Sequence, residues 1–439
     1  MTLLLFLALA TAPQQAETKV RDAIGALEKA LTAKDDSVGD QFDFQRLLKE
    51  MERRGSIPEG TADGFQSRGV RRLEDNFSTI VSAPGALYGG WERVEPLSVR
   101  INPSGDEAQA FCRVTIGGKK GKFRFWLSRA GDAWKPFDYE NLDGTYRLSV
   151  IGLQYAPGVY DDEDKNSLRD GVMTLQRGAV YLSKGQAAGA RDALAMAKRS
   201  TPPAYVMDWI ELVDGLALNA LGNSSAGLKA ADRVLAHQKD LAVAYRLKAA
   251  CHLALGEPAK TILAAKEYLG LIGDDAEAWT LVGAACEKLD QADQALEAYR
   301  KAADADAEDP DSRRKLCRLL RRLRRFDEAE GSIRQAIERS ADKTLFQDEL
   351  GRTLAARGKL EDALAVADGL KGEEPRLELR VAVCAIAGKR EQALQTLQQL
   401  LEQHPERHGA VAGGDELEEF RKLPAVQDLF GKARAKVRK

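Results

Sequence analysis

Hydrophobic and small residues recur at helical spacing through the second half of the chain, and this arrangement itself repeats. Between Gly171 and Pro405, one arrangement occurs seven times. It consists of a small residue, a second landmark seven residues later and an alanine near position twenty. Ala295, Ala329 and Ala363 mark equivalent positions, each 34 residues after the one before. Apolar residues three or four apart predict amphipathic helices, so each period predicts a pair of helices.

These landmarks resemble those of the tetratricopeptide repeat family, whose period is 34 residues. The fourth predicted repeat carries the fullest set of them: Trp279, Gly283, Ala295, Tyr299 and Ala302. Because one helix pair cannot bury its own apolar face, neighbouring pairs must stack on one another. The resemblance implies an all-α superhelix of seven helix pairs over residues 171–405. Capping helices over residues 406–439 would close it.

The period changes to two in the first half of the chain. The segments in which apolar and polar residues alternate are residues 97–101, 110–116 and 123–128. Alternation of this kind predicts strands, and the short glycine-containing turns between them predict an antiparallel meander. Helices are predicted before the strands, over residues 17–33, 44–53 and 65–81. Residues 17–155 therefore predict an α+β domain with helices on one face of its sheet.

The order of these elements and a closing hairpin resemble the nuclear-transport-factor-2-like fold. The hairpin reads Gly131-Asp132-Ala133-Trp134-Lys135-Pro136-Phe137-Asp138. The resemblance implies a curved sheet that wraps helices into a cone, and such a cone can bind or transform a small apolar molecule. Five aromatic residues are candidates for lining this pocket: Trp91, Phe123, Phe125, Trp126 and Trp134. The alternative is that they form the hydrophobic core.

The first sixteen residues have the pattern of an export signal. Residues 3–10 are an apolar run, and Ala10-Thr11-Ala12 supplies small residues for cleavage. No basic residue precedes the run, so an apolar N-terminal helix of a cytoplasmic protein is the alternative. The sequence thus predicts a protein exported to a bacterial periplasm or secreted, with no transmembrane segment after cleavage. Residues 156–170, with Pro157-Gly158 and an acidic run, predict a linker.

Charge and cysteine positions exclude several classes of function. A formal net charge of −2 over 439 residues creates no general attraction to nucleic acid, so nucleic acid is not an expected partner. The five cysteines occupy positions where small apolar residues pack and show no metal-ligand spacing. They are Cys112, Cys251, Cys286, Cys317 and Cys384. We expect all five to be buried thiols.

Enzymatic chemistry has little support in the sequence. The four histidines all follow residue 236, so the α+β domain lacks an imidazole base. Asp138 and Tyr139 are adjacent on a predicted strand and must face opposite sides of it. His404 and His408 have metal-like spacing, but Pro405 interrupts the helix between them. We therefore expect no catalytic residue, metal or cofactor.

The highest density of charge lies in residues 313–325, where arginines alternate with leucines at helical spacing. In the tetratricopeptide family, positions two, five, nine and twelve of the first helix line a concave groove. The arginines that the resemblance places in the groove are Arg246, Arg314, Arg318, Arg321 and Arg352. Arginine pairs well with carboxylates, so this groove suits an acidic peptide or a free C-terminus. The alternative is a solvated face balanced by acids on adjacent helices, such as Asp348 and Glu349.

These observations lead to one main functional hypothesis and one alternative. The main hypothesis is an exported, non-enzymatic scaffold that binds a protein or peptide in the groove of its repeats. In the alternative, the N-terminal cone binds or transforms a small molecule and the repeats only dock it.

Overall fold

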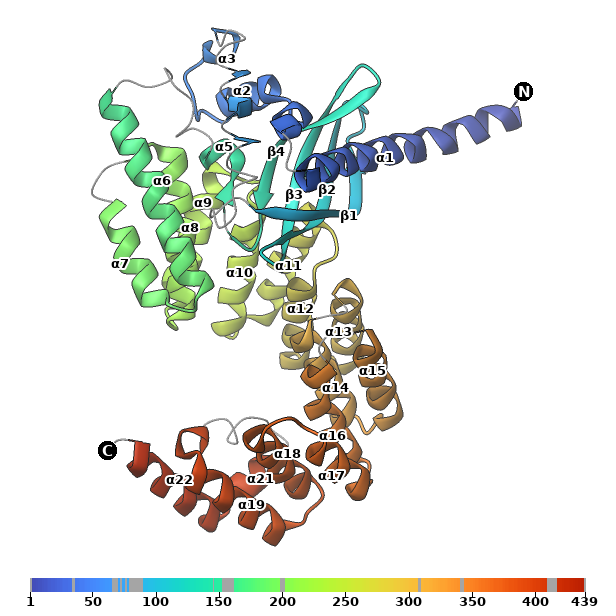
Figure 1. Cartoon of the computed structure of the whole chain (residues 1–439), viewed down its shortest axis with the longest axis vertical. Helices are drawn as coiled ribbons and strands as arrows, with labels where there is room; N and C mark the ends of the chain where they lie inside the picture. The colour runs from blue at the N-terminus through green and yellow to red at the C-terminus, as the bar shows by residue number, and fades with distance from the viewer. Residues whose placement is uncertain are drawn as a thin grey trace. The chain divides into compact units, whose positions relative to one another are not determined.

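The structure of the protein is a computed structural model, shown in Figure 1. It describes residues 2–33, 36–64, 70–71, 73–75, 77–78, 90–144, 146–151, 162–197, 202–306, 309–339, 343–408 and 417–437. The contacts within the chain form two compact units, residues 1–273 and 274–439. The first unit contains the sheet and three helix pairs. The second contains the remaining described helices.

The sheet of the first unit is an antiparallel meander. Its strands lie side by side in chain order. They are β1 (Trp91–Ile101), β2 (Glu107–Ile116), β3 (Lys119–Ala130), β4 (Ala133–Asn141) and β5 (Tyr146–Arg147). In the register, Phe125 of β3 lies between Ala110 of β2 and Tyr139 of β4. The meander that the alternating pattern predicts is therefore confirmed.

Helices cover the sheet as the sequence predicts. The long α1 (Thr2–Ala33) packs against β1 and β4, and Figure 1 shows it crossing the sheet. Its buried stripe has the predicted helical spacing: Val20, Ile24, Leu27 and Leu31. The elements that follow are the 3-10 helix η1 (Asp36–Gln41), α2 (Phe44–Arg53) and α3 (Thr61–Gly64), and α5 (Leu148–Ile151) follows the sheet. Most of the predicted helix over residues 65–81 lies outside the described residues.

Three helix pairs complete the first unit. They are α6 (Asp162–Ser183) with α7 (Ala187–Ala197), α8 (Ala204–Ala220) with α9 (Ser224–His237), and α10 (Ala242–Ala254) with α11 (Pro258–Ile272). We call the sheet with its helices, up to residue 151, the sheet domain. Residues 162–170, which the sequence analysis assigned to a linker, are instead the start of α6. Acidic residues are favoured in the first turn of a helix, so this acidic run suits a helix start.

The second unit is entirely helical. Its pairs are α12 (Ala276–Lys288) with α13 (Ala292–Ala305), α14 (Pro310–Arg322) with α15 (Phe326–Arg339), α16 (Gln347–Ala356) with α17 (Leu360–Asp368), and α18 (Glu373–Ile386) with α19 (Arg390–Gln403). The 3-10 helices η3 (Lys343–Phe346) and η4 (Pro405–Arg407) and the final helices α21 (Glu418–Arg421) and α22 (Pro424–Val437) complete it. With the first unit, the described residues thus contain seven helix pairs.

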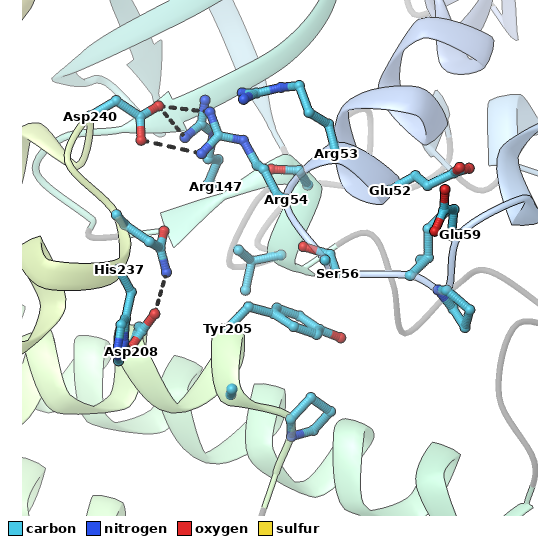
Figure 2. Close-up of a pocket in the computed structure, with 18 of the residues that line it drawn as sticks. Glu52, Arg53, Arg54, Ser56, Glu59, Arg147, Tyr205, Asp208, His237 and Asp240 are labelled. Atoms are coloured by element: carbon cyan, nitrogen blue, oxygen red, sulfur yellow. Dashed lines mark hydrogen bonds and ion pairs between the residues drawn. The ribbon is translucent and has the colours of Figure 1, made fainter.

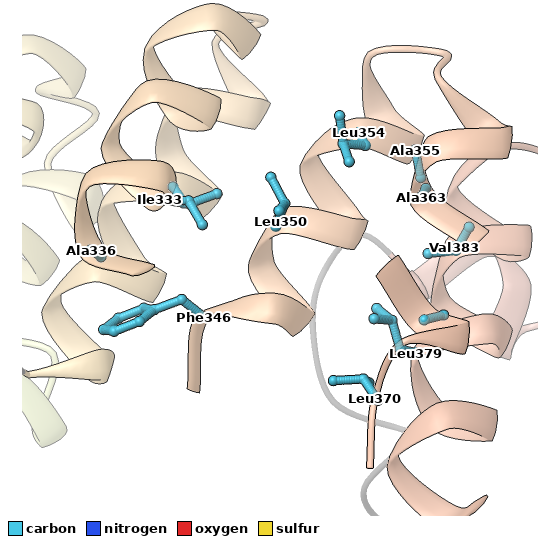
Figure 3. Packing of buried hydrophobic residues seen from close by; sticks show 12 residues of the cluster. Ile333, Ala336, Phe346, Leu350, Leu354, Ala355, Ala363, Leu370, Leu379 and Val383 are labelled. Carbon is cyan, nitrogen blue, oxygen red and sulfur yellow. The ribbon is translucent and has the colours of Figure 1, made fainter. Parts of the chain in front are cut away.

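Neighbouring pairs share continuous cores rather than having one core each. One cluster runs from Cys317 of α14 through Phe346 and Leu350 to Leu379 and Val383 of α18, and Figure 3 shows its packing. The last helix, α22, buries Val426, Phe430 and Ala433 against α18 and α19. Its polar residues near the end remain exposed, as a terminal cap requires. All five cysteines are buried free thiols, as predicted.

One left-handed residue lies between the two helices of every described pair. These residues are Gly185, Gly222, Gly256, Asp290, Arg324, Gly358 and Gly388. From Gly222 to Gly358, each follows the last by 34 residues. Glycine adopts a positive φ without steric cost, whereas other residues bring Cβ close to the carbonyl oxygen. Asp290 (φ 58°) and Arg324 (φ 57°) are therefore strained versions of a glycine position.

We predict that Arg324→Gly raises the free energy of unfolding of the second unit by about 0.5–1 kcal/mol, because it removes this strain. Differential scanning calorimetry would record a higher melting temperature. The matched control is Gly358→Ala, which puts a Cβ at φ 87° and should lower the melting temperature. A lower melting temperature for Arg324→Gly would contradict the strain argument.

A charged junction joins the sheet domain to the loop between α9 and α10. The Asp240 carboxylate receives Arg54 at 2.7 and 3.2 Å and Arg147 at 3.3 Å. The Asp240 backbone carbonyl accepts a hydrogen bond from Arg124 at 2.9 Å. Burial alone would raise the pKa of Asp240, but the hydrogen bond from Arg54 and the charges of the arginines hold it far below its ordinary value. We call Arg54, Arg124, Arg147 and Asp240 the junction.

Buried carboxylates of the sheet domain also bind arginines of the junction. Arg147 donates to Asp138 at 2.7 Å, and Asp138 also accepts from the Ser149 hydroxyl at 2.9 Å. Arg124 pairs with Glu140. The Trp126 ring lies 4.3 Å from the Arg124 guanidinium and 3.8 Å from that of Arg147. Each buried charge therefore has an opposite charge or an aromatic face beside it, which a low-dielectric site requires.

Glu50 holds the third arginine of the junction. Its buried carboxylate accepts from Arg54 at 2.6 Å and from Arg53 at 2.6 and 2.9 Å. Burial, the largest influence, raises the pKa of Glu50, but the hydrogen bond from Arg53 and the charges of Arg54, Arg53 and Arg147 together lower it to about 2. Because the pKa in the folded state lies below the unfolded value, ionised Glu50 stabilises the fold above pH ~4.5.

We predict that Glu50→Gln lowers the free energy of unfolding at pH 7 by about 1–3 kcal/mol. The difference from wild type should shrink as the pH falls from ~5 towards ~2, because wild-type Glu50 then becomes protonated. Urea unfolding at a series of pH values measures this. The exposed Glu361→Gln is the control and should change stability little at any pH. A deficit that is independent of pH would show that the charge of Glu50 is not what stabilises the fold.

Candidate functional site

The arginine-rich helix α14 is amphipathic, as its sequence predicts. It begins at Pro310, and the Asp309 side chain caps it by accepting from the amides of Asp311 and Ser312. Its buried apolar residues are Leu316, Cys317, Leu319 and Leu320. Because these residues fix which side of the helix faces the core, they also fix which arginines reach the solvent.

Arg321 is buried and holds two helices together. Its guanidinium donates to Glu349 at 2.6 Å and to the Thr353 hydroxyl at 3.2 Å, which joins α14 to α16. Both partners of the ion pair are at most 6% exposed. Burial raises the pKa of Glu349, and the adjacent Arg321 charge opposes that rise. Arg321 was predicted to line the groove, but the structure places it in the core between repeats five and six.

Arg314 and Arg318 are the accessible members of the predicted set. The Arg314 side chain is 53% exposed, with Asp311 at 3.0 Å and Glu349 at 3.6 Å. The Arg318 side chain is 35% exposed and lies 3.8 Å from Glu287. The Arg314–Asp311 pair is exposed on both sides, and such pairs contribute little to stability. Another carboxylate can therefore replace Asp311 at small cost.

The remaining two predicted arginines have partners within the protein. Arg352 pairs with Asp348 on its own helix at 2.7 Å. Arg246 of α10 donates to the Leu142 carbonyl at 3.1 Å and lies 3.9 Å from Asp143. Its side chain is only 12% exposed, because the turn after β4 covers it. Arg246 belongs to the first unit and the other four arginines to the second.

The acids that balance these arginines include one that the sequence analysis missed. Asp348 and Glu349 do pair with arginines, as the alternative interpretation expected. Glu287 of α12 also accepts from Arg322 and from the Tyr299 hydroxyl, both at 2.7 Å. The repeat period could have identified Glu287, because it lies 34 residues before Arg321 and so occupies the equivalent position of repeat four. The face of α14 is therefore partly neutralised.

The five aromatic residues proposed for a pocket form core packing on two sides of the sheet. Trp91 packs edge-to-face on Phe123 and Phe125, with ring centroids 5.3 and 5.9 Å apart. Tyr139 closes this group at 5.0 Å from Trp91. Trp126 instead belongs to the opposite face, between the arginines of the junction. Trp134 is also buried. These residues therefore do not line one shared pocket, because successive strand residues alternate between faces.

A cleft of about 1100 Å³ opens beside the junction, within the first unit. Residues 52–59 and 147–150 of the sheet domain and residues 203–208 and 237–240 of the helix pairs contribute to its wall. Figure 2 shows Arg54 and Arg147 pointing towards Asp240, while Glu52 and Glu59 lie on the far side. The lining has equal numbers of basic and acidic side chains: Arg53, Arg54, Arg147 and Lys239 against Glu52, Glu59, Asp208 and Asp240. Its charge therefore favours neither anions nor cations. Four separate segments build it, so no motif could reveal it.

Metal and membrane sites have no support among the residues that the structure describes. In that part of the chain, no cluster of three or more His, Cys, Asp or Glu side chains is arranged to hold a metal ion. His404 and His408 point to Glu406 and to the Pro405 carbonyl respectively. No described helix is both long enough and apolar enough to cross a bilayer.

Comparison with known proteins matches one segment of the chain to a family. A family model for the tetratricopeptide repeat matches residues 315–376. No curated protein sequence matches the chain. A tetratricopeptide repeat protein from Parabacteroides merdae is 14% identical with a TM-score of 0.43, and the match covers 61% of this chain and 99% of that one. PilF of Pseudomonas aeruginosa is 16% identical with a TM-score of 0.38, covering 58% and 99%. YrrB, described as a TPR protein with an unusual peptide-binding site, is 22% identical with a TM-score of 0.30, covering 42% and 96%.

The family match covers the segment from α14 into α18. Before that segment, the left-handed residues keep the same 34-residue step back to Gly222. The resemblance of the sheet domain to the nuclear-transport-factor-2-like fold stays a prediction. Residues 315–376 match the tetratricopeptide repeat family.

Proposed function

We propose that the protein is an exported, non-enzymatic scaffold that binds an acidic segment of a partner on the first helices of repeats four to six. Tetratricopeptide arrays generally act as interaction scaffolds, because stacked helix pairs present an extended surface. The observation that carries the proposal is the exposure of Arg314 and Arg318 beside the buried Arg321. The buried pair keeps α14 in place, while the exposed arginines remain able to change partners.

The electrostatics of this face suit carboxylates. Arginine presents a planar fork that matches the two oxygens of a carboxylate. Arg314, Arg318 and Arg322 lie along one side of α14, and their side chains are between 35% and 53% exposed. A partner carboxylate that replaces Asp311 or Glu287 restores the same ion pair. Binding therefore requires little net desolvation of charge, and the long-range attraction raises the association rate.

We predict that Arg314→Glu with Arg318→Glu weakens binding of an acidic peptide by at least about tenfold. The probe is a short fluorescent peptide rich in Asp and Glu with a free C-terminus, measured by fluorescence polarisation at low salt. Arg321 is kept because its removal would leave Glu349 buried without a partner. The melting temperature should fall, because the new carboxylates lie near Glu349 and Glu287, so the affinity is measured well below it.

The control for this pair is Arg334→Glu, an exposed arginine on the second helix of repeat five. It makes the same type of charge change away from the proposed face, so the peptide affinity should stay close to wild type. If the double variant binds the acidic peptide as tightly as wild type does, the proposed face is wrong. A peptide with carboxamides in place of carboxylates tests whether charge is the feature recognised.

Export through an N-terminal signal over residues 1–16 is the second part of the proposal. Supporting it, the buried stripe of α1 begins at Val20, while Gln14 and Gln15 are exposed. Arg21 also anchors the helix by donating to the Pro96 carbonyl at 3.0 Å. Removal of residues 1–16 therefore leaves the packed part of α1 intact.

We predict that a chain starting at Glu17 has the same melting temperature as the full chain within about 1 °C, because no described core residue is lost. Expression of the full gene in a bacterial host, followed by mass measurement of the periplasmic protein, tests the cleavage. Recovery of the uncleaved chain in the cytoplasm alone would favour the other interpretation, an apolar N-terminal helix.

A further inference from the structure

The first helix of repeat three already holds a segment of the same chain. Arg246 lies on α10 and contacts the turn that follows β4. Its guanidinium donates to the Leu142 carbonyl at 3.1 Å and lies 3.9 Å from the Asp143 carboxylate. This turn is shaped by Asn141, whose side-chain oxygen accepts from the amides of Asp143 and Gly144. A carbonyl followed by a carboxylate thus faces an arginine on a repeat helix.

Other contacts hold the turn against repeat three. The junction anchors the sheet domain at Asp240, immediately before α10. Arg100 of β1 donates to the carbonyls of Leu269 and Gly270 in α11. The sheet domain therefore contacts repeat three both before α10 and near the end of α11. These contacts hold the Leu142–Asp143 turn against α10, so a segment of the same chain covers Arg246.

Arg246 and Arg314 occupy the same position of their repeats. They are 68 residues apart, which is two periods of 34. Each lies ten residues before the left-handed residue of its repeat, Gly256 for Arg246 and Arg324 for Arg314. Their exposure differs, because the Arg246 side chain is 12% exposed and that of Arg314 is 53% exposed. One position is occupied by the chain itself, and its equivalent is accessible.

We propose that the Leu142–Asp143 turn is an internal copy of the ligand that Arg314 binds from a partner. This rests on the proposed function and makes its ligand more specific. The partner segment offers a backbone carbonyl and, on the next residue, a carboxylate to the Arg314 guanidinium. As at Arg246, the carbonyl accepts a hydrogen bond from the guanidinium and the carboxylate adds the attraction of a nearby opposite charge.

The ligand of repeat five needs more acidic residues than the turn that contacts repeat three. Four residues after Arg246 comes Ala250, whereas four residues after Arg314 comes Arg318. Arg322 adds a further exposed guanidinium one turn later. The partner segment therefore carries at least one more acidic residue beside its carbonyl–carboxylate pair. In a free peptide of this segment, Glu140 supplies such a second acidic residue, three positions before Asp143.

The test uses the full chain and a fluorescent peptide of residues 139–144, acetylated and amidated so that only side chains are charged. We expect this peptide to bind, and Asn in place of Asp143 in the peptide to weaken binding by about tenfold. Arg314→Gln in the protein should weaken it equally. Arg334→Gln, an exposed arginine on α15, is the matched control and should leave the affinity unchanged.

A scrambled peptide of the same composition separates this inference from the proposed function. If the scrambled peptide binds as tightly, or if Arg314→Gln leaves binding intact, the internal-copy inference is wrong, although an acidic scaffold still stands. If neither these peptides nor the Asp- and Glu-rich probe binds, the proposed function is wrong as well. Weaker binding of the scrambled peptide, together with loss on Arg314→Gln, would establish both.

Discussion

The arrangement of the first unit depends on one carboxylate that satisfies several buried arginines. Asp240 lies in the loop before α10 and receives Arg54 and Arg147, while its backbone carbonyl receives Arg124. Burying a guanidinium without a partner is very costly. Separation of the sheet domain from repeat three would remove these contacts with Asp240 and leave each arginine only its carboxylate within the sheet domain. This explains why the sheet domain and the first three helix pairs form one compact unit.

The same residue type performs two different roles along the repeats, and burial decides which. Arg321 is closed between α14 and α16 with Glu349, so its charge holds the helices together. Arg314, two turns earlier on α14, keeps an exposed and replaceable partner. A buried pair is costly to break, whereas an exposed pair is worth little. The exposed arginines of α14 therefore lie on a helix that the buried pair holds in place.

Glycine positions show how a repeat tolerates variation. The residue between the two helices of a pair must adopt a positive φ, and glycine is its natural occupant. Gly283 shows a second constraint, because a Cβ there would lie 2.5 Å from the ring of Tyr299. Asp290 and Arg324 adopt the positive φ without being glycine, and the cost is a strained backbone. At Gly283 there is no space for a side chain, because the two helices of repeat four touch at that point.

The candidate site was only partly predictable. Arg314 and Arg318 were identified through the family's groove positions, and both are accessible. Arg321 and Arg246 were identified by the same rule but are covered, one by α16 and the other by the turn after β4. The cleft beside the junction had no signal, because its walls come from segments far apart in the chain. The five aromatic residues were recognisable as important, and their burial in a core was the alternative already considered.

Local patterns determined the secondary structure of this protein. The 34-residue period, the alternation over the strands and the stripe of α1 each depend on neighbouring residues, and the sequence displays them directly. Tertiary structure alone decided which charged side chains became partners. Asp240 meets Arg54 across 186 residues of chain, and no periodicity relates them. Burial of a charge depends on what packs over it, so only the folded chain separates an arginine that binds its own protein from one that can bind another.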